Sequence, residues 1–294
     1  MSKSQGPPDI GAPFVAAVES MEGLEPVGEK VGEAVRKALP PGPVKDALSG
    51  TWIGHALHPL LTDVVIGSFT SASVLDLLGG DGDGKAAERL LAVGIAAYLP
   101  TALTGVSDYA DSELNGPEIR RVGLVHAGTN AVALGCYVAS LRARRNGRPT
   151  RGKLLGLLGA SVLGAAGHLG GHMSYVQGIG VNQTAFDEGP EDWTEAGSAG
   201  DIADDQPTAV SVGETPVMLV RTGGRLHALH DRCSHRGCPL SESKLDGDVI
   251  ECFCHGSRFR LVDGSIERGP ATTPQPSYEV RERDGKIEIR LPSG

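Results

Sequence analysis

Four long apolar stretches, separated by short polar connections, occupy the first two thirds of the chain. They run approximately over residues 57–78, 86–105, 122–141 and 154–173. Each is close to the ~20 residues that an α-helix needs to cross a bilayer. Aspartate, serine and threonine are scattered through them, which suits helices whose polar groups face one another rather than lipid. The pattern predicts a four-helix transmembrane bundle, and a buried soluble helical bundle is the alternative.

A different periodicity begins near residue 193, where short segments of strand-like composition are separated by turn residues. Residues 216–221 and 225–230 flank Thr-Gly-Gly, and residues 278–283 and 286–291 flank Asp-Gly. Asp-Gly between two such segments is a strong β-hairpin signal. Residues 193–294 are therefore expected to form a small antiparallel all-β domain, which makes the chain a multi-domain protein with an all-α part and an all-β part.

The first 50 residues place apolar side chains at helical spacing, with acids and lysines between them. Those side chains are Phe14, Val18, Met21, Leu24, Val27, Val31, Val35 and Leu39. The spacing predicts an amphipathic helix that packs on another part of the protein or lies on a membrane surface, and packing is favoured. The expected domains are then an N-terminal segment at 1–50, the bundle at 51–181, an acidic linker at 182–208 and the β domain at 193–294.

The distribution of charge bears on partners and on orientation. The net charge of −9 offers no basic footprint for a nucleic acid. The connection between the third and fourth apolar stretches is strongly basic, with Arg142, Arg144, Arg145, Arg148, Arg151 and Lys153, whereas the linker at 182–208 holds eight acids. The positive-inside rule places the basic connection in the cytoplasm, so the β domain is expected on the extracytoplasmic side. Arg120 and Arg121, at the other end of the third stretch, weaken this orientation.

Two short motifs in the β region carry the candidate chemistry. Residues 233–238 (CSHRGC) and 252–257 (CFCHGS) each hold a cysteine and a histidine at metal-ligand spacing. Two thiolates and two imidazoles are the donors of a Rieske [2Fe-2S] centre, where histidines replace cysteines on one of the irons. Zinc takes the same donors, but a zinc site gives no reason for the second cysteine of each motif.

The C-x-H-x-x-C and C-x-C-H-G-S pattern resembles the Rieske proteins of cytochrome bc-type complexes and the small Rieske ferredoxins. The resemblance implies that Cys233 and Cys252 bind the buried iron of a [2Fe-2S] cluster. It implies that His235 and His255 bind the outer iron near solvent. A disulfide between Cys238 and Cys254 would join the two ligand loops, and residues 269–271 (GPA) would cover the cluster. Such a disulfide favours an oxidising compartment.

Two further positions are interpreted through this resemblance. Ser257 would donate its hydroxyl to a bridging sulfide of the cluster. High-potential members carry a tyrosine two residues later, where this chain has Phe259. Hydrogen bonds to the sulfurs stabilise the reduced cluster and raise its potential. The missing donor therefore predicts a mid-range potential, below that of the bc-complex proteins.

Residues 50–183 resemble a family of uncharacterised four-helix membrane proteins that begin with an H-x-x-H-P element, here residues 55–59 (HALHP). The resemblance implies a membrane location but no settled activity. An up-down bundle would bring several polar side chains to one membrane side, namely His58, His126, His168, His172 and Asp63. They could ligate a b-type haem, bind a quinol and accept its protons, or only hold the helices together.

These observations favour a membrane-anchored Rieske protein that transfers single electrons. The donor would be a quinol, a haem or a reductase, the acceptor is unidentified, and an exposed edge of His235 and His255 would be the docking surface. The alternatives are a redox-sensing or structural membrane protein, and an electron-supply subunit of a separate oxygenase. The chain is expected to be an electron-transfer protein or oxidoreductase subunit rather than a self-contained enzyme, because the 39 residues after His255 hold no histidine for a mononuclear iron. Its expected partners are the bilayer and a redox protein or quinone.

Overall fold

The computed structural model describes residues 11–80, 82–187 and 189–293. The first ten residues of the expected N-terminal segment and Glu188 of the expected linker lie outside that range. The chain divides into two compact units, one ending at Ala38 and resuming over His58–Ile179, the other formed by Leu39–Leu57 and Gly180–Gly294. This division differs from the boundaries expected from the sequence, because it joins residues 39–57 to the β domain.

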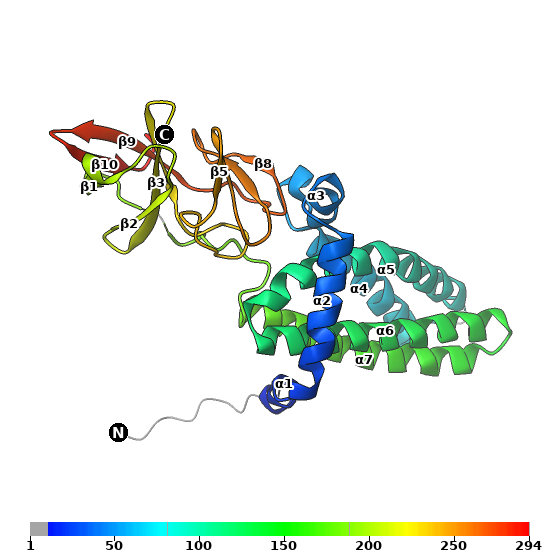
Figure 1. The fold of residues 1–294 in the computed structure, drawn as a ribbon. Helices are drawn as coiled ribbons and strands as arrows, with labels where there is room; N and C mark the ends of the chain where they lie inside the picture. Colours follow the sequence, from blue (N-terminus) through cyan, green and yellow to red (C-terminus); the bar gives the residue numbers. More distant parts are fainter. Residues whose placement is uncertain (1–10, 81, 188, 294) are drawn as a thin grey trace, which may run out of the picture. The chain divides into compact units, whose positions relative to one another are not determined.

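The first unit is built from helices. They are α1 (Ala12–Glu19), α2 (Glu25–Ala38), α4 (Leu57–Leu78), α5 (Gly84–Ser112), α6 (Pro117–Arg145) and α7 (Pro149–Tyr175), with 3-10 turns η1 (Glu22–Leu24) and η3 (Glu113–Asn115) (Figure 1). Helices α4 to α7 are long and apolar enough to cross a membrane, which confirms the four expected spans. Pro117 and Pro149 begin α6 and α7, where the missing N–H needs no partner. Except for α4, these helices extend beyond the apolar stretches into polar sequence.

Charged side chains join α2 to one end of the long helices. The carboxylate of Glu113, only 1% exposed, accepts hydrogen bonds from Arg36 Nη1 at 2.5 Å and from Arg120 Nε at 2.7 Å. Arg120 also binds Glu29 of α2 at 2.9 Å. A buried carboxylate is tolerated only when cationic donors surround it. This network therefore holds α2 against α5 and α6.

The amphipathic pattern predicts that α2 packs through its apolar side chains. The structure shows instead that α2 packs through glycines. Val27 and Val31 are 51% and 37% exposed, whereas Gly28 and Gly32 are buried. A Cβ on Gly28 would come within 2.5 Å of Arg120 Cγ. The close approach that allows the ion pairs to form thus requires a residue without a side chain.

The helix pairs α4–α5 and α6–α7 repeat one set of contacts. In the first pair, His58 Nδ1 lies 2.9 Å from the carbonyl oxygen of Thr101. In the second pair, His126 Nδ1 lies 2.9 Å from the carbonyl oxygen of Ala166. His58 is the second residue of α4 and His126 is the tenth residue of α6, and each reaches the backbone of the next helix. The two helical hairpins therefore use their histidines in the same way.

The correspondence continues along the bundle. Phe69 follows His58 by eleven residues and Tyr137 follows His126 by eleven, and the two rings stack with centroids 3.7 Å apart. About two helical turns after the stacked rings, Asp76 of α4 and Arg144 of α6 form a bidentate ion pair. Each ring lies against a glycine of the following helix, where a Cβ would fall within about 3 Å: Phe69 on Gly94, His58 on Gly105, Tyr137 on Gly159 and His126 on Gly170.

The second unit is built from two antiparallel sheets. One has the order β1-β10-β9-β4-β3-β2, with β1 (Thr194–Ser198), β2 (Thr208–Val212), β3 (Thr215–Thr222), β4 (Arg225–His230), β9 (Ser277–Arg283) and β10 (Lys286–Arg290). The other has the order β5-β6-β7-β8, with β5 (Lys244–Asp246), β6 (Val249–Glu251), β7 (Arg258–Arg260) and β8 (Ile266–Arg268). A 3-10 turn, η4 (Ala199–Asp201), follows β1. The ligand motifs lie in the connections that follow β4 and β6.

Both expected hairpins are present in the larger sheet. β3 pairs with β4 through Thr222 and Arg225, and β9 pairs with β10 through Arg283 and Lys286. Asp284 and Gly285 of the second turn have φ of 52° and 76°. Positive φ at both central residues matches the right-handed twist of the strands, which is why Asp-Gly predicts this turn.

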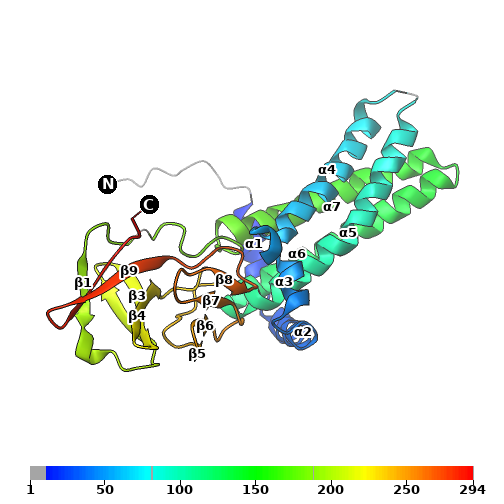
Figure 2. The ribbon, with the colours of Figure 1, turned by 90° about the horizontal axis from the view of Figure 1, so that it is seen from above.

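The second unit also contains a short helical segment from the N-terminal part of the sequence. α3 (Pro43–Ser49) and η2 (Thr51–Ile53) belong to it, and α3 lies beside β8 in both views (Figure 1 and Figure 2). Gly50 separates the two elements with φ of 87°, and a Cβ there would collide with the carbonyl oxygen of His55. This turn therefore depends on glycine.

Candidate metal centre

The two ligand motifs fold into loops that are closed by equivalent backbone hydrogen bonds. The N–H of Cys233 donates to the carbonyl of Cys238 at 2.9 Å. The N–H of Cys252 donates to the carbonyl of Ser257 at 2.8 Å, across the same number of residues. The first loop follows β4 of the larger sheet and the second follows β6 of the smaller sheet, and both ligand cysteines lie in one buried cluster with residues of the two sheets.

A glycine completes each loop. Gly237 N–H donates to the carbonyl of Cys233 at 2.8 Å, and Gly256 N–H donates to the carbonyl of Cys252 at 2.9 Å. Their φ values are 80° and 76°. Residues with a side chain adopt this left-handed conformation only at an energetic cost. The glycine in each motif is therefore a requirement of the loop backbone.

Two of the four cysteines in the motifs are joined and two remain as thiols. Cys238 and Cys254 form a disulfide that ties the two loops together. Cys233 and Cys252 are free and almost fully buried, at 1% and 2% exposure. The sulfur of Cys252 lies within 4.8 Å of both bridged sulfurs, but those are already bonded to each other. The sulfur donors that are left for a metal are Cys233 and Cys252.

The four expected ligands come together in pairs, thiol beside thiol and imidazole beside imidazole. A hydrogen bond between the thiols lowers the pKa of Cys252 to about 7 and raises the pKa of Cys233 well above its usual value. The rings of His235 and His255 meet edge to face with centroids 5.1 Å apart. Thiolates and neutral imidazoles are the forms that ligate metals. This pair of sulfurs and pair of imidazoles fits the donor set of a two-iron cluster with mixed ligation.

The histidine edge is not the open surface that the sequence had suggested. His255 is 8% exposed, and burial lowers the pKa of His235 well below its usual range. The charges of Arg236, His255 and Lys45 lower the pKa of His235 further. A Cβ on Gly256 would come within 2.7 Å of Pro41 Cγ, so the segment that contains α3 packs against the histidine loop.

Ser257 lies where a hydroxyl can serve a cluster. Its side chain is fully buried, and its Oγ accepts the N–H of Ala271 at 3.0 Å. Because the amide of Ala271 donates to this oxygen, the hydroxyl proton of Ser257 is free to donate to another group. Ala271 follows the Gly269–Pro270 pair, so the loop at 269–271 closes over this side of the site. Both observations fit the expected role of Ser257.

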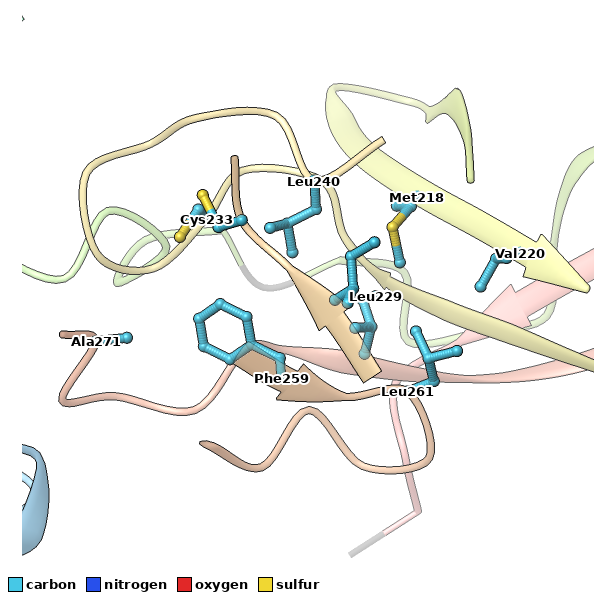
Figure 3. Close-up of a cluster of buried hydrophobic side chains, with 10 residues drawn as sticks. Met218, Val220, Leu229, Cys233, Leu240, Phe259, Leu261 and Ala271 are labelled. Carbon is cyan, nitrogen blue, oxygen red and sulfur yellow. The ribbon is translucent and has the colours of Figure 1, made fainter. Parts of the chain in front are cut away.

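The apolar core ends at the metal centre. Figure 3 shows Cys233 at one end of a buried cluster, with Leu240 and Phe259 next to it and Ala271 at the edge. Phe259 is 0% exposed. A buried, water-poor surrounding strengthens electrostatic interactions with any charged group bound there.

Gln275 is a buried residue of the site that the motifs did not predict. It is 1% exposed, and its Nε2 donates to the carbonyl oxygens of His230 at 2.6 Å and Arg232 at 2.7 Å. Its Oε1 accepts the N–H of Ser234 at 2.9 Å. The amide thereby joins the loop after 271 to the first ligand loop. Its only sequence signal is a polar residue between two prolines, which does not reveal a partner.

The polar residues expected to gather in the bundle are divided between different contacts. His172 Nε2 lies 3.1 Å from Glu19 Oε1, and the ring of His168 lies 6.3 Å from that of Phe14, so both contact α1. Asp63 is exposed.

His58 and His126 remain as an equivalent pair on α4 and α6. Each holds its ring by an Nδ1 contact with a backbone carbonyl. His126 Nε2 also lies 3.2 Å from Asn130 Nδ2, whereas a haem iron would need that nitrogen for itself. The Nδ1 contact orients the His126 ring as in a haem ligand. Haem binding through Nε2 would have to displace Asn130 from that nitrogen.

Comparison with known families agrees with this geometry. Residues 192–279 match the family model of the Rieske [2Fe-2S] domain, and residues 54–183 match that of a predicted membrane protein (DUF2231). The first match contains all four expected ligands and the disulfide. The second spans the four long helices.

Individual relatives match the C-terminal part. The chain is 31% identical over 100 residues to the anthranilate 1,2-dioxygenase ferredoxin subunit of Burkholderia cepacia, which covers 34% of this chain and 93% of the relative. It is 35% identical to ferredoxin CarAc of Metapseudomonas resinovorans, over 33% of this chain and 92% of the relative. The solved ferredoxin of carbazole 1,9a-dioxygenase from Nocardioides aromaticivorans IC177 is 25% identical, with 34% of this chain and 98% of that chain covered and a TM-score of 0.33.

Proposed function

This chain belongs to the Rieske [2Fe-2S] proteins through its C-terminal domain, and we propose that it is a membrane-anchored carrier of single electrons with Cys233, His235, Cys252 and His255 as cluster ligands. When bound, the [2Fe-2S] cluster supplies reversible uptake and release of one electron. The observation that carries the proposal is the pair of buried free thiols beside the two edge-to-face imidazoles. The disulfide removes the remaining sulfurs from competition and braces the loops.

The residues around the ligands have distinct tasks in this proposal. Ser257 and the loop at 269–271 hold the sulfide side of the site, with the hydroxyl of Ser257 as a hydrogen-bond donor. Gln275 fixes the first ligand loop to the covering loop. The buried core excludes water from the cysteine side. Together they hold four donors in place while the electron count changes, which keeps the reorganisation small.

We place the electron acceptor among oxygenase components, since several similar proteins are named as ferredoxin subunits or components of dioxygenases. One electron enters from a reductase or another membrane donor, and the same electron leaves to the acceptor, so no atom is transferred. The four-helix domain would hold this carrier at the membrane. By the positive-inside rule, the β domain would lie on the extracytoplasmic side.

A haem or quinol site in the bundle stays a prediction. Of its five candidate residues we favour His58 and His126, which hold equivalent positions on α4 and α6. His172 is paired with Glu19, and Asp63 and His168 are exposed. A redox role for the bundle would therefore rest on these two imidazoles alone.

Spectroscopy of the full-length protein in detergent tests the carrier. We expect the EPR signal of a reduced Rieske cluster after dithionite, and its loss in Cys233→Ser. Cys136→Ser is the matched control, because Cys136 is a free cysteine on α6 and should leave the signal intact. The optical spectrum of the same sample reports a Soret band if the bundle holds haem. Zinc in place of iron, with no EPR signal, would contradict the proposal.

A further inference from the structure

Residues 39–57 have an inverted surface, with polar side chains turned inward and large apolar side chains turned outward. Lys45 and Ser49 are 3% and 5% exposed, whereas Val44 and Trp52 are 63% and 70% exposed. In soluble proteins lysine and serine are mostly exposed, and apolar side chains gather at the surface where a partner or a lipid covers them. The outward face of this segment is therefore more apolar than its inward face.

The outward face also carries few groups that lipid would have to desolvate. Lys45 and Asp46 are the charged residues between positions 39 and 57 other than His55, and neither of the two is exposed. The indole N–H of Trp52 donates to the carbonyl oxygen of Ala47 at 3.2 Å. Because this donor is satisfied inside the segment, the ring can enter an apolar medium without losing a hydrogen bond.

The segment leads directly into the first membrane span. Trp52 precedes Leu57, the first residue of α4, by five residues. Five residues reach at most ~18 Å when fully extended, so Trp52 lies close to the level at which α4 enters the bilayer. Tryptophan is enriched at that level, because its ring is apolar and its N–H is polar. The lipid headgroup region is thus a surface that this part of the chain already reaches.

The same segment contacts the loops that surround the expected ligands. Thr51 Oγ1 donates to the carbonyl oxygen of Ala271 at 3.1 Å. A Cβ on Gly256, the residue after His255, would come within 2.7 Å of Pro41 Cγ. The segment that enters α4 is therefore packed on the ligand-loop end of the β domain, which is the end formed by residues 233–238, 252–257 and 269–271.

The chain that leaves the last span is joined to the same end. The N–H of Gln183 donates to the carbonyl oxygen of Ser234 at 3.1 Å, and Gln183 Oε1 accepts a hydrogen bond from Arg232 at 3.3 Å. Four candidate spans separate this connection from residues 39–57, and an even number of crossings returns the chain to the same membrane side. Two connections on one side of the membrane thus both meet the ligand loops.

We infer that residues 39–57 form an interfacial segment, which inserts Val44 and Trp52 into the lipid headgroup region and seats the ligand-loop end of the β domain at the membrane surface. The partner of this face is the lipid surface on the side where α4 begins. The lipid contact goes beyond the proposed electron transfer and requires no cluster. It therefore stands or falls separately from the proposed function.

The two tryptophans of the chain provide a direct test of the lipid contact. Trp193 is the matched control for Trp52, because the guanidinium groups of Arg281 and Arg290 cover its ring at 4.1 and 4.6 Å from the centroid. Trp193→Phe leaves Trp52 as the single tryptophan, and Trp52→Phe leaves Trp193. Both full-length variants are reconstituted into phosphatidylcholine vesicles with acyl chains brominated near the glycerol end, and into the same vesicles without bromine.

Bromine quenches tryptophan emission at close range, so the two variants should respond differently. The emission of Trp52 should fall by roughly half in the brominated vesicles, as expected for a ring ~5–10 Å below the membrane surface. The emission of Trp193 should be the same in both kinds of vesicle. Equal emission of Trp52 in both would overturn the inference. If that emission instead changes when the protein is diluted in the membrane, the face binds a second copy of the chain, and the inference is again wrong.

The seating of the β domain is measured by EPR of membranes dried into oriented multilayers. This readout rests on the proposed function, because it uses the signal of the reduced cluster. In the wild type the signal should depend on the angle between membrane and magnetic field, and the double variant Val44→Ser/Trp52→Ser should lose much of that dependence. Val262→Ser is the control, since Val262 is 71% exposed in the connection between β7 and β8.

The outcomes of the two measurements separate the two ideas. An angular dependence that is unchanged in the double variant would contradict seating by these side chains. A wild-type protein without the Rieske EPR signal would contradict the proposed function, whereas quenching of Trp52 would still support the lipid contact.

Discussion

Phe259 illustrates how one side chain sets both packing and chemistry. It is fully buried in the core next to Cys233 (Figure 3). It stands two residues after Ser257, at the position where the high-potential Rieske proteins have a tyrosine. The phenyl ring carries no hydroxyl, so under the proposed function Ser257 would be the side-chain hydroxyl left to donate to the cluster. Fewer donors leave the reduced state less stabilised.

Phe259→Tyr should therefore raise the midpoint potential. One added hydrogen bond of about 1 kcal/mol corresponds to ~40 mV for a one-electron couple. Redox titration of the variant checks this value, with Phe186→Tyr as the control, because Phe186 is 97% exposed. An unchanged potential in a variant with normal cluster content would refute the explanation for the expected mid-range potential.

At the scale of elements, the bundle is organised around contacts between α4 and α6. The stacked rings of Phe69 and Tyr137 and the ion pair of Asp76 and Arg144 hold these helices together at successive levels. The side chains of the ion pair are 3% and 4% exposed, and Arg144 binds both carboxylate oxygens of Asp76. A buried pair of this kind makes each partner indispensable to the other, because the survivor is left as an uncompensated charge.

Asp76→Asn should destabilise the helical unit by about 3–5 kcal/mol. Thermal unfolding of the purified protein in detergent, followed by far-UV circular dichroism, measures the loss. Glu88→Gln is the control, because Glu88 pairs with Arg145, whose side chain is 59% exposed. That surface pair should contribute less than ~1 kcal/mol. Equal losses in the two variants would mean that the pair at Asp76 is no more important than one at the surface.

The repeated contacts of the two helical hairpins were not apparent from the residues themselves. His58 and His126 are the same residue type, as are the glycines on which they lie. Phe69 and Tyr137 share only an aromatic ring, and Asp76 and Arg144 are opposite in charge. Residues at corresponding positions of α4 and α6 contact each other, so they need to be complementary in shape or charge and need not be identical. The repeat therefore becomes visible only when the contacts are compared.

At the scale of the whole molecule, the charges on either side of α7 suggest an orientation in the membrane. The α6–α7 connection is basic, while the residues that lead from α7 to the β domain carry acids and no lysine or arginine. Basic connections are retained in the cytoplasm. The β domain with its disulfide would then face an oxidising compartment, where such bonds persist.

A reporter fused after Gly294 tests this orientation, and it should be active only outside the cytoplasm. A second fusion at Gly147, in the exposed turn between α6 and α7, should report the cytoplasm. The two fusions control for each other, because they lie on opposite sides of one predicted span. Cytoplasmic activity from the fusion after Gly294 would reverse the orientation.

The sequence by itself determined the features that depend on neighbouring residues. The Asp284-Gly285 turn, the four apolar stretches and the two ligand motifs each carry their own signal within a few residues. Turn conformation, helix length in a bilayer and metal-ligand spacing are local properties, so composition and spacing suffice to predict them.

Only the tertiary structure decided which distant surfaces meet. Residues 39–57 follow the amphipathic pattern of the N-terminal segment, yet they pack on the ligand loops through Pro41 and Thr51. Gln275 and Gly28 likewise acquire their roles from partners far along the chain. The physical reason is that burial and charge pairing depend on the shapes of two complementary surfaces. Neither surface is specified by the residues on one side alone.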